Sequence, residues 1–456
     1  MSVTQTDITY PSSIDPALTT LKALIAYPTG ASNLAICVVM HGWTQTVADL
    51  TDSDMIARFA EGSYYMLASV TGSFDVGEDI AGSLGGAAVC NVASADQLVP
   101  RAVTTPFQVG EVVTGDDSGA TATIASIATN SLFCIYPELR GRNGSDGTPD
   151  GGGREVQDII DAIDYVLANY ASETDASQIH IVGYSGGGGN VQSATARYPD
   201  RFNGAVTFFG MCDYGYTPDR GWWYTNSSYR TTIEERLGGP PSLVNLAYQA
   251  RASILARRNY SGGHLYIYHD YDDGAVSVIN AERIISALDA LEYAYSANLT
   301  DHLSAVRWLH ESPQAGNSVI LAERDFLPVF TAKSHDAWTV PASGTLIACG
   351  WLDSSRFNLW LDDGLANYAE ITYNTSTRTF TVRSAQTVDV VLSLKNQTPS
   401  ASVTITLNGE EYTETANGSG VATYSATVAP VASAVAEYVN LRRQVGLPSS
   451  IWTSIA

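Results

Sequence analysis

Lysine is nearly absent from the sequence. Only Lys22, Lys333 and Lys395 occur in 456 residues, and with arginine they give 24 basic residues against 47 acidic ones, a formal net charge of −23. Nucleic acids and anionic membrane surfaces are bound through clusters of positive charge. The composition therefore excludes both as expected partners, and we interpret the acidity as a property that keeps the chain soluble.

Common metal and disulfide patterns are also missing. The five cysteines are scattered and odd in number, which predicts buried thiols instead of a disulfide framework. Neither C-x-x-C nor H-E-x-x-H occurs. The Asp270/Asp272 spacing hints at calcium, but Ala281 stands where an EF-hand loop requires glutamate. We expect no metal and no cofactor.

Long apolar runs and targeting signals are not found either. No stretch is apolar over the length that spans a bilayer, and residues 1–7 carry neither a basic region nor an apolar core. The sequence therefore predicts no membrane insertion, no secretory signal and a cytoplasmic location at synthesis.

The most informative stretch present runs from Gln178 to Asn190. Ile179–Val182 predicts a short buried strand, and residues 190–197 predict a helix. Between them Gly183-Tyr184-Ser185-Gly186-Gly187 fits G-x-S-x-G, with glycine where strand and helix nearly collide. Strand, sharp turn and helix are the context of a nucleophile elbow. The pattern predicts Ser185 as a catalytic nucleophile.

Two strands, Thr20–Tyr27 and Leu34–Met40, are predicted upstream, and the second ends in His41-Gly42-Trp43. In α/β-hydrolases a buried strand delivering such a segment usually supplies an oxyanion donor. The backbone N–H groups of Trp43 and Gly186 are therefore predicted to form the oxyanion hole. His41 is interpreted as a loop histidine that orients its own turn.

A duplicated segment follows the predicted strand Tyr64–Ala68. Phe74-Asp-Val-Gly-Glu-Asp-Ile-Ala-Gly82 matches Phe107-Gln-Val-Gly-Glu-Val-Val-Thr-Gly115, 33 residues later. Each copy predicts a β-hairpin, and the pair a small β-module. The second copy resembles a short β-repeat of tailed-phage virion proteins, which implies a virion context. A decorative loop in a cellular hydrolase is the alternative.

The middle of the chain predicts another strand at residues 132–137, a helix at 154–167 and a lid-like excursion from Gly221 to Arg258. The carboxylates at 158, 161 and 164 lie opposite the apolar stripe of the predicted helix and are interpreted as a solvated face. Trp222 and Trp223 form a substrate wall or pin the excursion to the core, and with Tyr184 they are the substrate-binding candidates.

Several of these segments together resemble the hydrolase domain of the prolyl oligopeptidase family. The resemblance covers roughly residues 20–90 and 130–340, without that family's β-propeller, and propeller-less relatives are commonly esterases. It rests on five segments: His41-Gly42-Trp43, Arg140-Gly-Arg-Asn-Gly144, the elbow, Tyr198-Pro-Asp-Arg-Phe202 and Tyr248-Gln-Ala-Arg-Ala-Ser253.

The resemblance also guides the choice of the acid. The family pattern H-G-x-x-D-x-x-V falls on His269 to Val276 and places the acid on Asp273, with Asp270 in the position of the glycine and Asp272 in reserve.

The base is predicted from position. His302 and His310 flank a helix-like segment, whereas His335 follows a predicted strand at 326–334, the position a base requires. Ser185, Asp273 and His335 are therefore the predicted triad, in the chain order of α/β-hydrolases.

From Trp338 onward, alternating strands and hairpin turns such as Asn408-Gly409 predict a β-sandwich-like domain, closed by a helix at 431–444. Carbohydrate binding through Trp351, Trp360 or Tyr373, assembly, and bracing of the hydrolase are its open roles. The predicted organisation is an α/β-hydrolase doubly wound sheet (1–68 and 132–340), an inserted β-module (69–131) and a C-terminal β-rich domain (341–456).

We therefore expect a serine hydrolase that cleaves a small ester or deacetylates an acylated carbohydrate, associated with a virion or acting in a cell. A serine peptidase taking short peptides is the first alternative. A virion structural or receptor-binding protein with an inactive hydrolase scaffold is the second. Homo-oligomers or virion assembly through the β-rich regions stay open as partners.

Overall fold

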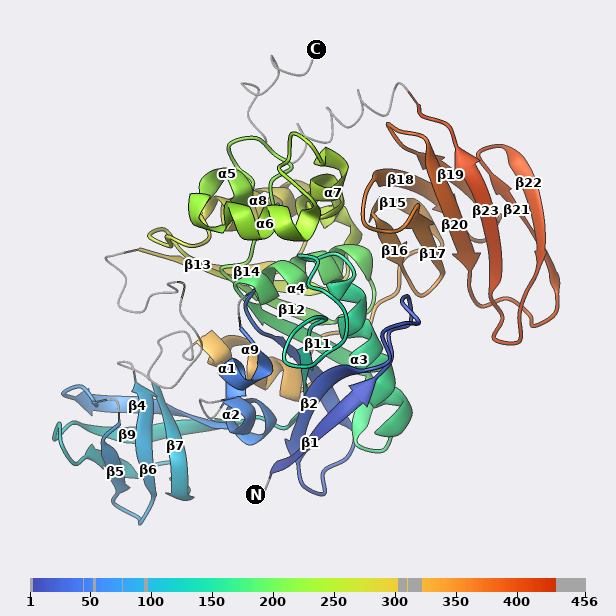
Figure 1. The fold of residues 1–456 in the computed structure, drawn as a ribbon. Coiled ribbons are helices and arrows are strands. Elements are labelled where there is room, and N and C mark those ends of the chain that lie inside the picture. The colour runs from blue at the N-terminus through green and yellow to red at the C-terminus, as the bar shows by residue number, and fades with distance from the viewer. Residues whose placement is uncertain are drawn as a thin grey trace.

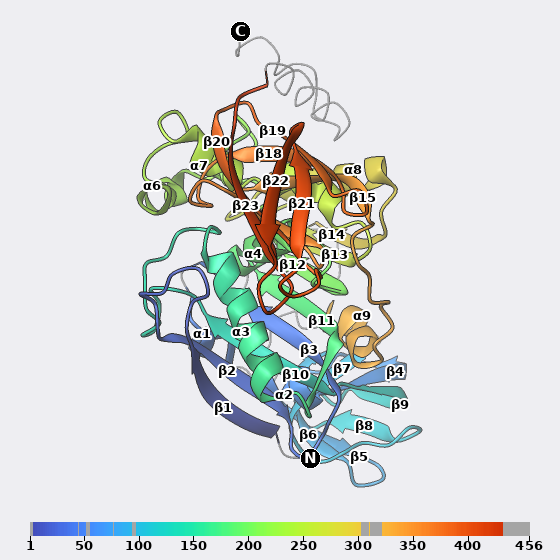
Figure 2. The same cartoon turned by 90° about the vertical axis from the view of Figure 1, so that its right-hand side faces the viewer.

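The computed structural model describes residues 3–43, 45–51, 55–75, 77–93, 97–301, 310 and 322–431. They form a central mixed sheet covered by helices, with a small barrel at one end and a second β domain at the other (Figure 1). The view turned by 90° shows the same order, with the hydrolase sheet between the two additions (Figure 2).

The central sheet has eight strands in the order β1-β2-β10-β3-β11-β12-β13-β14. β1 and β2 are antiparallel to their neighbours, and the strands from β10 to β14 are mutually parallel. The strands are β1 (Val3–Tyr10), β2 (Leu21–Pro28), β3 (Leu34–Met40), β10 (Leu132–Glu138), β11 (Thr174–Tyr184), β12 (Gly204–Phe208), β13 (His264–Asp270) and β14 (Tyr295–Thr300).

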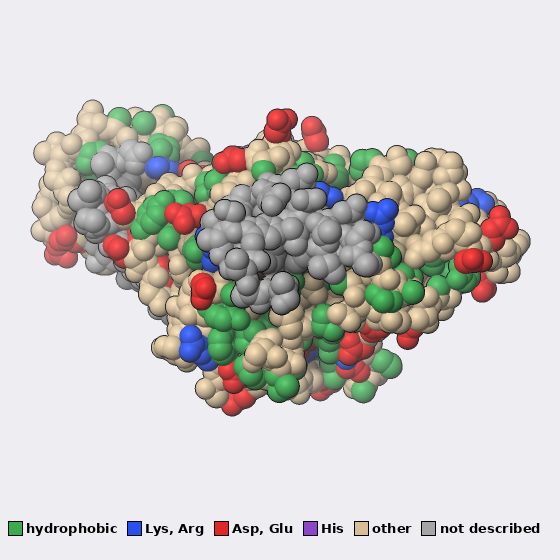
Figure 3. Space-filling view, turned by 90° about the horizontal axis from the view of Figure 1, so that it is seen from above, with side chains coloured by type: hydrophobic (Ala, Val, Ile, Leu, Met, Phe, Trp, Pro, Cys, Tyr) green, Lys and Arg blue, Asp and Glu red, His purple; other side chains and the backbone are tan. Residues whose placement is uncertain are grey.

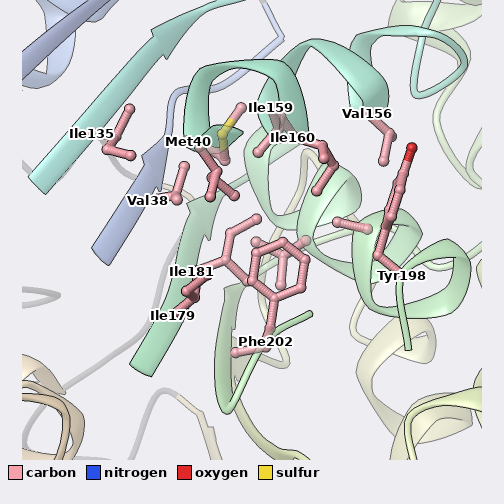
Figure 4. Close-up of a cluster of buried hydrophobic side chains, with 14 of the residues drawn as sticks. Val38, Met40, Ile135, Val156, Ile159, Ile160, Ile179, Ile181, Tyr198 and Phe202 are labelled. Atoms are coloured by element: carbon pink, nitrogen blue, oxygen red, sulfur yellow. The ribbon is translucent and has the colours of Figure 1, made fainter. Parts of the chain in front are cut away.

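Helices cover both faces of this sheet. One face packs against α3 (Glu155–Asn169), α4 (Gly186–Arg197) and α8 (Ile279–Leu291), and the other against α1 (Val47–Thr51), α2 (Met55–Glu61) and α9 (Glu323–Thr331). Figure 4 shows the first of these cores, where Ile159 and Ile160 of α3 meet Val38 of β3 and Ile181 of β11. Every residue of β3 is buried, as expected of a central parallel strand. The predicted α/β-hydrolase fold is confirmed.

Two local predictions in this domain are wrong. Residues 323–331 form α9, because Phe326, Leu327 and Phe330 repeat with helical spacing on one buried face. The carboxylates of α3 are not all solvated either. Asp158 is fully buried and receives two hydrogen bonds from Arg140, and Asp161 is 7 % exposed and accepts from Ser13 N at 2.9 Å.

A lid of short helices lies between β12 and β13. Its elements are α5 (Trp222–Thr225), the 3₁₀ turn η1 (Ser227–Tyr229), α6 (Arg230–Leu237), α7 (Asn245–Ala250) and a second 3₁₀ turn, η2 (Ser253–Asn259). This agrees with the predicted excursion. Among the described residues, no helix has both the length and the apolar character that a bilayer crossing requires.

The duplicated segment forms a closed six-stranded barrel in place of two paired hairpins. The strand predicted at residues 64–68 belongs to this barrel and not to the central sheet, so the insertion begins earlier than predicted. Its strands are β4 (Ser63–Thr71), β5 (Asp79–Gly82), β6 (Ala87–Ala93), β7 (Gln97–Thr105), β8 (Val112–Gly115) and β9 (Thr121–Thr129), in the order β4-β7-β6-β5-β8-β9.

The C-terminal domain is a nine-stranded sheet in the order β22-β21-β19-β18-β15-β16-β17-β20-β23. It surrounds a core of its own, in agreement with the predicted β-rich domain. The helix predicted at 431–444 lies outside the described residues. The strands are β15 (Ser343–Cys349), β16 (Trp351–Asp353), β17 (Phe357–Leu361), β18 (Tyr368–Asn374), β19 (Thr379–Arg383), β20 (Val388–Leu394), β21 (Ser402–Leu407), β22 (Glu410–Thr415) and β23 (Ala422–Val428).

Acidic side chains are scattered over one face of the molecule. Seen from above, Asp and Glu lie at several places on this face, with some Lys and Arg among them (Figure 3).

Candidate active site

Ser185 stands at a strained turn between β11 and α4. Its φ of 55° and ψ of −116° are uncommon for a residue other than glycine, and such strain concentrates at functional sites. Its neighbours have no room for side chains: a Cβ on Gly183 would lie 2.2 Å from Gly187 O, and one on Gly187 2.3 Å from Met40 O. The backbone thus has the form of the nucleophile elbow predicted from G-x-S-x-G.

Asp273 lies in the loop after β13, at the same carboxyl-terminal edge of the sheet as Ser185. Its Oδ1 accepts the N–H groups of Ala275 at 2.8 Å and Val276 at 2.9 Å. Its Oδ2 lies 3.2 Å from His269 Nε2 and 3.2 Å from His310 Nδ1. Burial alone would raise the pKa of Asp273, but the hydrogen bonds from the two histidines hold it well below the usual value.

His310 lies near both this acid and the serine. It contacts Asp273 through Nδ1, and it lines the same cavity as Ser185. The ring of Phe209 packs against its imidazole, with centroids 4.7 Å apart. His310 is not among the predicted site residues.

His335 lies at the opposite edge of the sheet. Its Nε2 is 3.1 Å from Tyr266 Oη, and its ring stacks on His264, the first residue of β13. Its ring is 6.0 Å from that of His180, five residues before Ser185 on β11, so about 16 Å of extended strand separates it from the nucleophile. The structure does not bring His335 to Ser185, so the predicted position of the base is wrong. Among the described histidines, His310 is the one that contacts Asp273 and also lines the cavity of Ser185.

His335 was chosen as the base because of the apolar run that precedes it in the sequence. The apolar run before His335 was interpreted as a strand, whereas it is α9. The last parallel strand is β14 (Tyr295–Thr300), which the sequence analysis did not predict because its alternation is weak and most of its residues are not buried. Recognising β14 would have directed attention to the histidines just after it, His302 and His310, because a base is expected after the last strand.

The two predicted oxyanion donors are neighbours. A Cβ added to Gly186 would lie 2.6 Å from Trp43 N, so the two backbone amides lie side by side at the start of α4. His41 Nδ1 donates to Gly42 O at 2.8 Å, and Arg142 Nη1 donates to the same oxygen at 3.1 Å. Burial lowers the pKa of His41 to about 4, so this ring is neutral, as the interpretation of a loop histidine requires.

The cavity beside Ser185 has a volume of about 190 Å³. Aromatic side chains dominate its wall, and the substrate-binding candidates Tyr184 and Trp222 are among them. The lining residues are Gly42, Trp43, Gln45, Tyr184, Ser185, Phe209, Trp222, Tyr229, Ala275 and His310.

Trp223 does not line this cavity. Its Nε1 donates to Glu234 at 2.8 Å, and the Arg230 guanidinium lies 4.5 Å above its ring. Trp223 therefore joins α5 to α6 within the lid. The wall formed by Trp222 is fixed to the acid loop, because Trp222 Nε1 and Asn226 Nδ2 both donate to Ala275 O, at 2.8 and 2.6 Å.

Metal ligands are not gathered here. In the part of the chain that the structure describes, no three His, Cys, Asp or Glu side chains are arranged to hold a metal ion.

Fold and site define the class, an α/β-hydrolase with a serine at its nucleophile elbow. Residues 122–306 match the model of the prolyl oligopeptidase family. This match and the elbow together support a serine hydrolase. A search of curated proteins found no match.

Solved structures of similar fold include two acylaminoacyl peptidases and a peptidase. Pyrococcus horikoshii acylaminoacyl peptidase is 14 % identical at a TM-score of 0.42, over 73 % of this chain and 40 % of that one. A Mycobacterium tuberculosis puromycin-hydrolyzing peptidase is 14 % identical at a TM-score of 0.46, over 72 % and 39 %. An acylaminoacyl peptidase in complex with Z-Gly-Gly-Phe-chloromethyl ketone is 13 % identical at 0.44, over 75 % and 43 %. This chain therefore spans about two fifths of each of them.

Proposed function

We propose that this chain hydrolyses acyl bonds through a triad of Ser185, His310 and Asp273. The observation that carries the proposal is the 3.2 Å contact between Asp273 Oδ2 and His310 Nδ1, in a cavity whose wall also holds Ser185 at its strained turn. Nucleophile, acid and base then keep the same chain order, Ser–Asp–His, as other α/β-hydrolases.

The roles follow from this arrangement. Because Nδ1 of His310 donates to Asp273, its Nε2 is the basic nitrogen, and it takes the Ser185 proton as Oγ attacks the acyl carbon. The N–H groups of Trp43 and Gly186 stabilise the oxyanion of the tetrahedral intermediate. The imidazolium then gives its proton to the leaving amine or alkoxide as that bond breaks. Water repeats the sequence on the acyl-enzyme and frees Ser185.

The favoured substrate is a peptide or acylated amine with a neutral residue on the acyl side. Two observations support this choice: the match to the prolyl oligopeptidase family and the aromatic wall. An engineered cavity of about 150 Å³ holds benzene, so a cavity of about 190 Å³ fits one ring or a compact branched side chain.

Ester hydrolysis is the second candidate. It is favoured by the lining itself, since among the described residues that line the cavity His310 is the only one with an imidazole, amine or carboxyl group. This described part of the lining offers no partner for a charged peptide terminus. Deacetylation of a carbohydrate and a place in a virion stay predictions.

Matched substrates separate the two. The ratio of kcat/KM for a p-nitrophenyl acyl ester and for an aminoacyl or prolyl nitroanilide carrying the same acyl group decides between esterase and peptidase. A fluorophosphonate probe separates both from an inactive scaffold, which would not be labelled.

Three alanine variants test the triad. Ser185→Ala and His310→Ala are expected to lower kcat for the better substrate by about 10⁴–10⁶-fold, whereas His335→Ala should stay within a few-fold of the wild type. Circular dichroism confirms that each variant is folded. Loss of activity in His335→Ala with retention in His310→Ala would refute the assignment.

A further inference from the structure

Two buried arginines join the hydrolase to the C-terminal domain. Arg197, on α4, is 1 % exposed, and Arg251, directly after α7, is 3 % exposed. Each uses all three of its side-chain nitrogens to donate to backbone carbonyls. Both guanidiniums therefore fix the position of backbone segments through their carbonyl oxygens, whatever side chains those segments carry.

The two arginines reach the same three segments. Arg251 donates to Asp150 O at 3.0 Å and Gly151 O at 3.2 Å, to Ala247 O of α7 at 3.0 Å, and to Leu365 O of the C-terminal domain at 2.8 Å.

Arg197 repeats this pattern. It donates to Gly152 O at 2.7 Å, to Ala250 O of α7 at 2.7 Å and to Cys349 O of the C-terminal domain at 2.9 Å, and its guanidinium lies 4.0 Å above the ring of Trp351. The loop at residues 150–152, the lid helix α7 and the C-terminal domain are thus joined twice.

The loop at 150–152 in turn packs on the oxyanion segment. Gly151, at a φ of +63°, lies so close to Trp43 that an added Cβ would be 2.9 Å from Trp43 Cζ2. Gly152 lies against the ring of Tyr214, and that ring is 5.6 Å from the Trp43 ring. A shift of this loop therefore reaches the indole whose backbone N–H lies beside Gly186.

We propose that Arg251 is a positioning residue: anchored to the C-terminal domain at Leu365 O, it holds the 150–152 loop against Trp43 and so sets the oxyanion amide. The C-terminal β domain is then a working part of the catalytic unit and not a detachable binding module. This inference rests on the proposed function in one respect, the role of the Trp43 N–H as oxyanion donor.

Arg251→Met tests the inference, because methionine keeps the bulk and removes every donor. The matched control is Arg258→Met, since Arg258 pairs with Glu370 across the same domain junction at 4.0 Å without touching the 150–152 loop. We expect kcat to fall about 10- to 100-fold in Arg251→Met, as small misplacements in active sites do, with KM within about twofold. Affinity for a boronic-acid transition-state analogue should fall by the same factor as kcat/KM. Arg258→Met should change neither.

Hydrogen exchange gives a readout that does not depend on turnover. Amides of residues 41–47 should exchange faster in Arg251→Met than in the wild type, and at the wild-type rate in Arg258→Met. If the wild type neither turns over substrate nor reacts with a fluorophosphonate, the proposed function fails, and the exchange result still decides whether Arg251 positions the segment.

Unchanged exchange and kcat in Arg251→Met, or a change in KM alone, would overturn the inference. If Arg251→Met does not fold, Gly151→Ala tests the same contact from the other side. Its Cβ would meet the Trp43 ring, so we expect the same fall in kcat, and an unaltered kcat would again overturn the inference.

Discussion

The Asp273 carboxylate contacts His269 and two backbone N–H groups in addition to His310. His269 Nε2 lies 2.7 Å from Val276 O and 3.2 Å from Asp273 Oδ2, and since both are acceptors, this nitrogen carries the proton. With two backbone N–H groups on Oδ1, the carboxylate has a fixed orientation and stays ionised. Asp273 Oδ2, the oxygen that accepts a hydrogen bond from His310 Nδ1, is therefore held in one position.

Replacing this acid tests its role. Asp273→Asn keeps the shape but offers an amide to His310, which favours the wrong tautomer, so we expect kcat to fall about 10⁴-fold. Asp272→Asn is the control, because Asp272 is exposed and lies outside the cavity lining. Turnover of a p-nitrophenyl ester by the two folded variants is the measurement, and equal rates would remove Asp273 from the triad.

The buried histidine His180, which lies outside the proposed triad, is expected to make the stability of the fold depend on pH. His180 is fully buried, stacked on Phe330 and 6.0 Å from His335, and burial lowers its pKa to about 3. Its folded-state pKa lies below the unfolded value of about 6.5, so the unfolded chain binds more protons below that pH. Stability should therefore fall as pH drops from about 6.5 toward 3.

The expected slope from His180 alone is about 1.4 kcal/mol per pH unit. His180→Leu should remove this contribution, so its urea midpoint should vary less between pH 6.5 and 4 than that of the wild type. A slope unchanged by the substitution would show that other groups control acid unfolding.

At the scale of residues, the sequence predicted those site residues that belong to a short motif or directly follow a recognisable strand. Ser185 and Gly186 belong to one short motif, and Asp273 follows a recognisable strand. His310 could not be chosen with the same ease, because the strand that precedes it, β14, has weak alternation and was not recognised. Trp223 was grouped with Trp222 for being adjacent, yet only Trp222 reaches the cavity.

At the scale of elements, the barrel explains its own repeat. Glu111 is buried and accepts N–H groups from Gln108 in its own copy and from Leu84 and Gly86 in the other copy. In the same way, Glu78 accepts the backbone N–H groups of Asp75 in its own copy and of Asp117 and Ser118 in the other copy. Each copy thus closes the hairpin turn of its partner copy.

The glycine that ends each repeat makes room for this exchange. A Cβ on Gly82 would lie 2.0 Å from Glu111 Oε1, and one on Gly115 2.4 Å from Glu78 Oε1. Gly82→Ala should therefore destabilise the barrel by about 1–3 kcal/mol, since it displaces a buried, hydrogen-bonded carboxylate. Gly418→Ala, where a Cβ meets nothing within 4 Å, is the control.

Thermal unfolding of the two variants measures this difference. Gly82→Ala should also keep the wild-type kcat, because the barrel joins the hydrolase through Gly62 and Asn130, before the amino end of β10 and away from Ser185. Equal melting temperatures for Gly82→Ala and Gly418→Ala would contradict the account of the repeat.

Strand and helix predictions succeeded where periodicity was long and failed where it was short. The apolar stripe of α3 was clear, yet its polar face could not reveal that Arg140 pairs with Asp158, because that arginine lies outside the helix, in the loop between β10 and α3. The nine residues of α9 carry a proline at 328 and an apolar run that also suits a strand. Burial of Phe326, Leu327 and Phe330 on one face decides for the helix.

At the scale of the whole molecule, the two additions join the hydrolase in different ways. The barrel has its own core and joins the hydrolase where β4 begins and β9 ends, with Asn130 Nδ2 donating to Arg58 O at 2.8 Å and Ala128 of β9 packing against the hydrolase core. The C-terminal domain contacts α4, the helix that starts at the elbow, through Arg197 and through Asn259, which bonds both Ala196 O and Ile347 O. The additions therefore have different expected effects on catalysis.

The strand order of the central sheet was not predicted, because β1 and β14 were missed and two segments expected as strands lie in the barrel and in α9. The doubly wound class was predictable, because strands alternate with helices along the chain. The closure of the barrel was not, since it depends on pairing β4 with β9 across about 55 residues of chain. The resemblance of the second repeat to phage virion proteins stays a prediction, and no residue contact bears on it.

Labelling by a fluorophosphonate, followed by peptide mapping, tests the central claim most directly. We predict that the probe attaches to Ser185, that Ser185→Ala abolishes labelling, and that His310→Ala slows it at least about 10³-fold while His335→Ala labels at the wild-type rate. Attachment at another residue, or labelling of His310→Ala as fast as the wild type, would contradict a Ser185–His310–Asp273 triad.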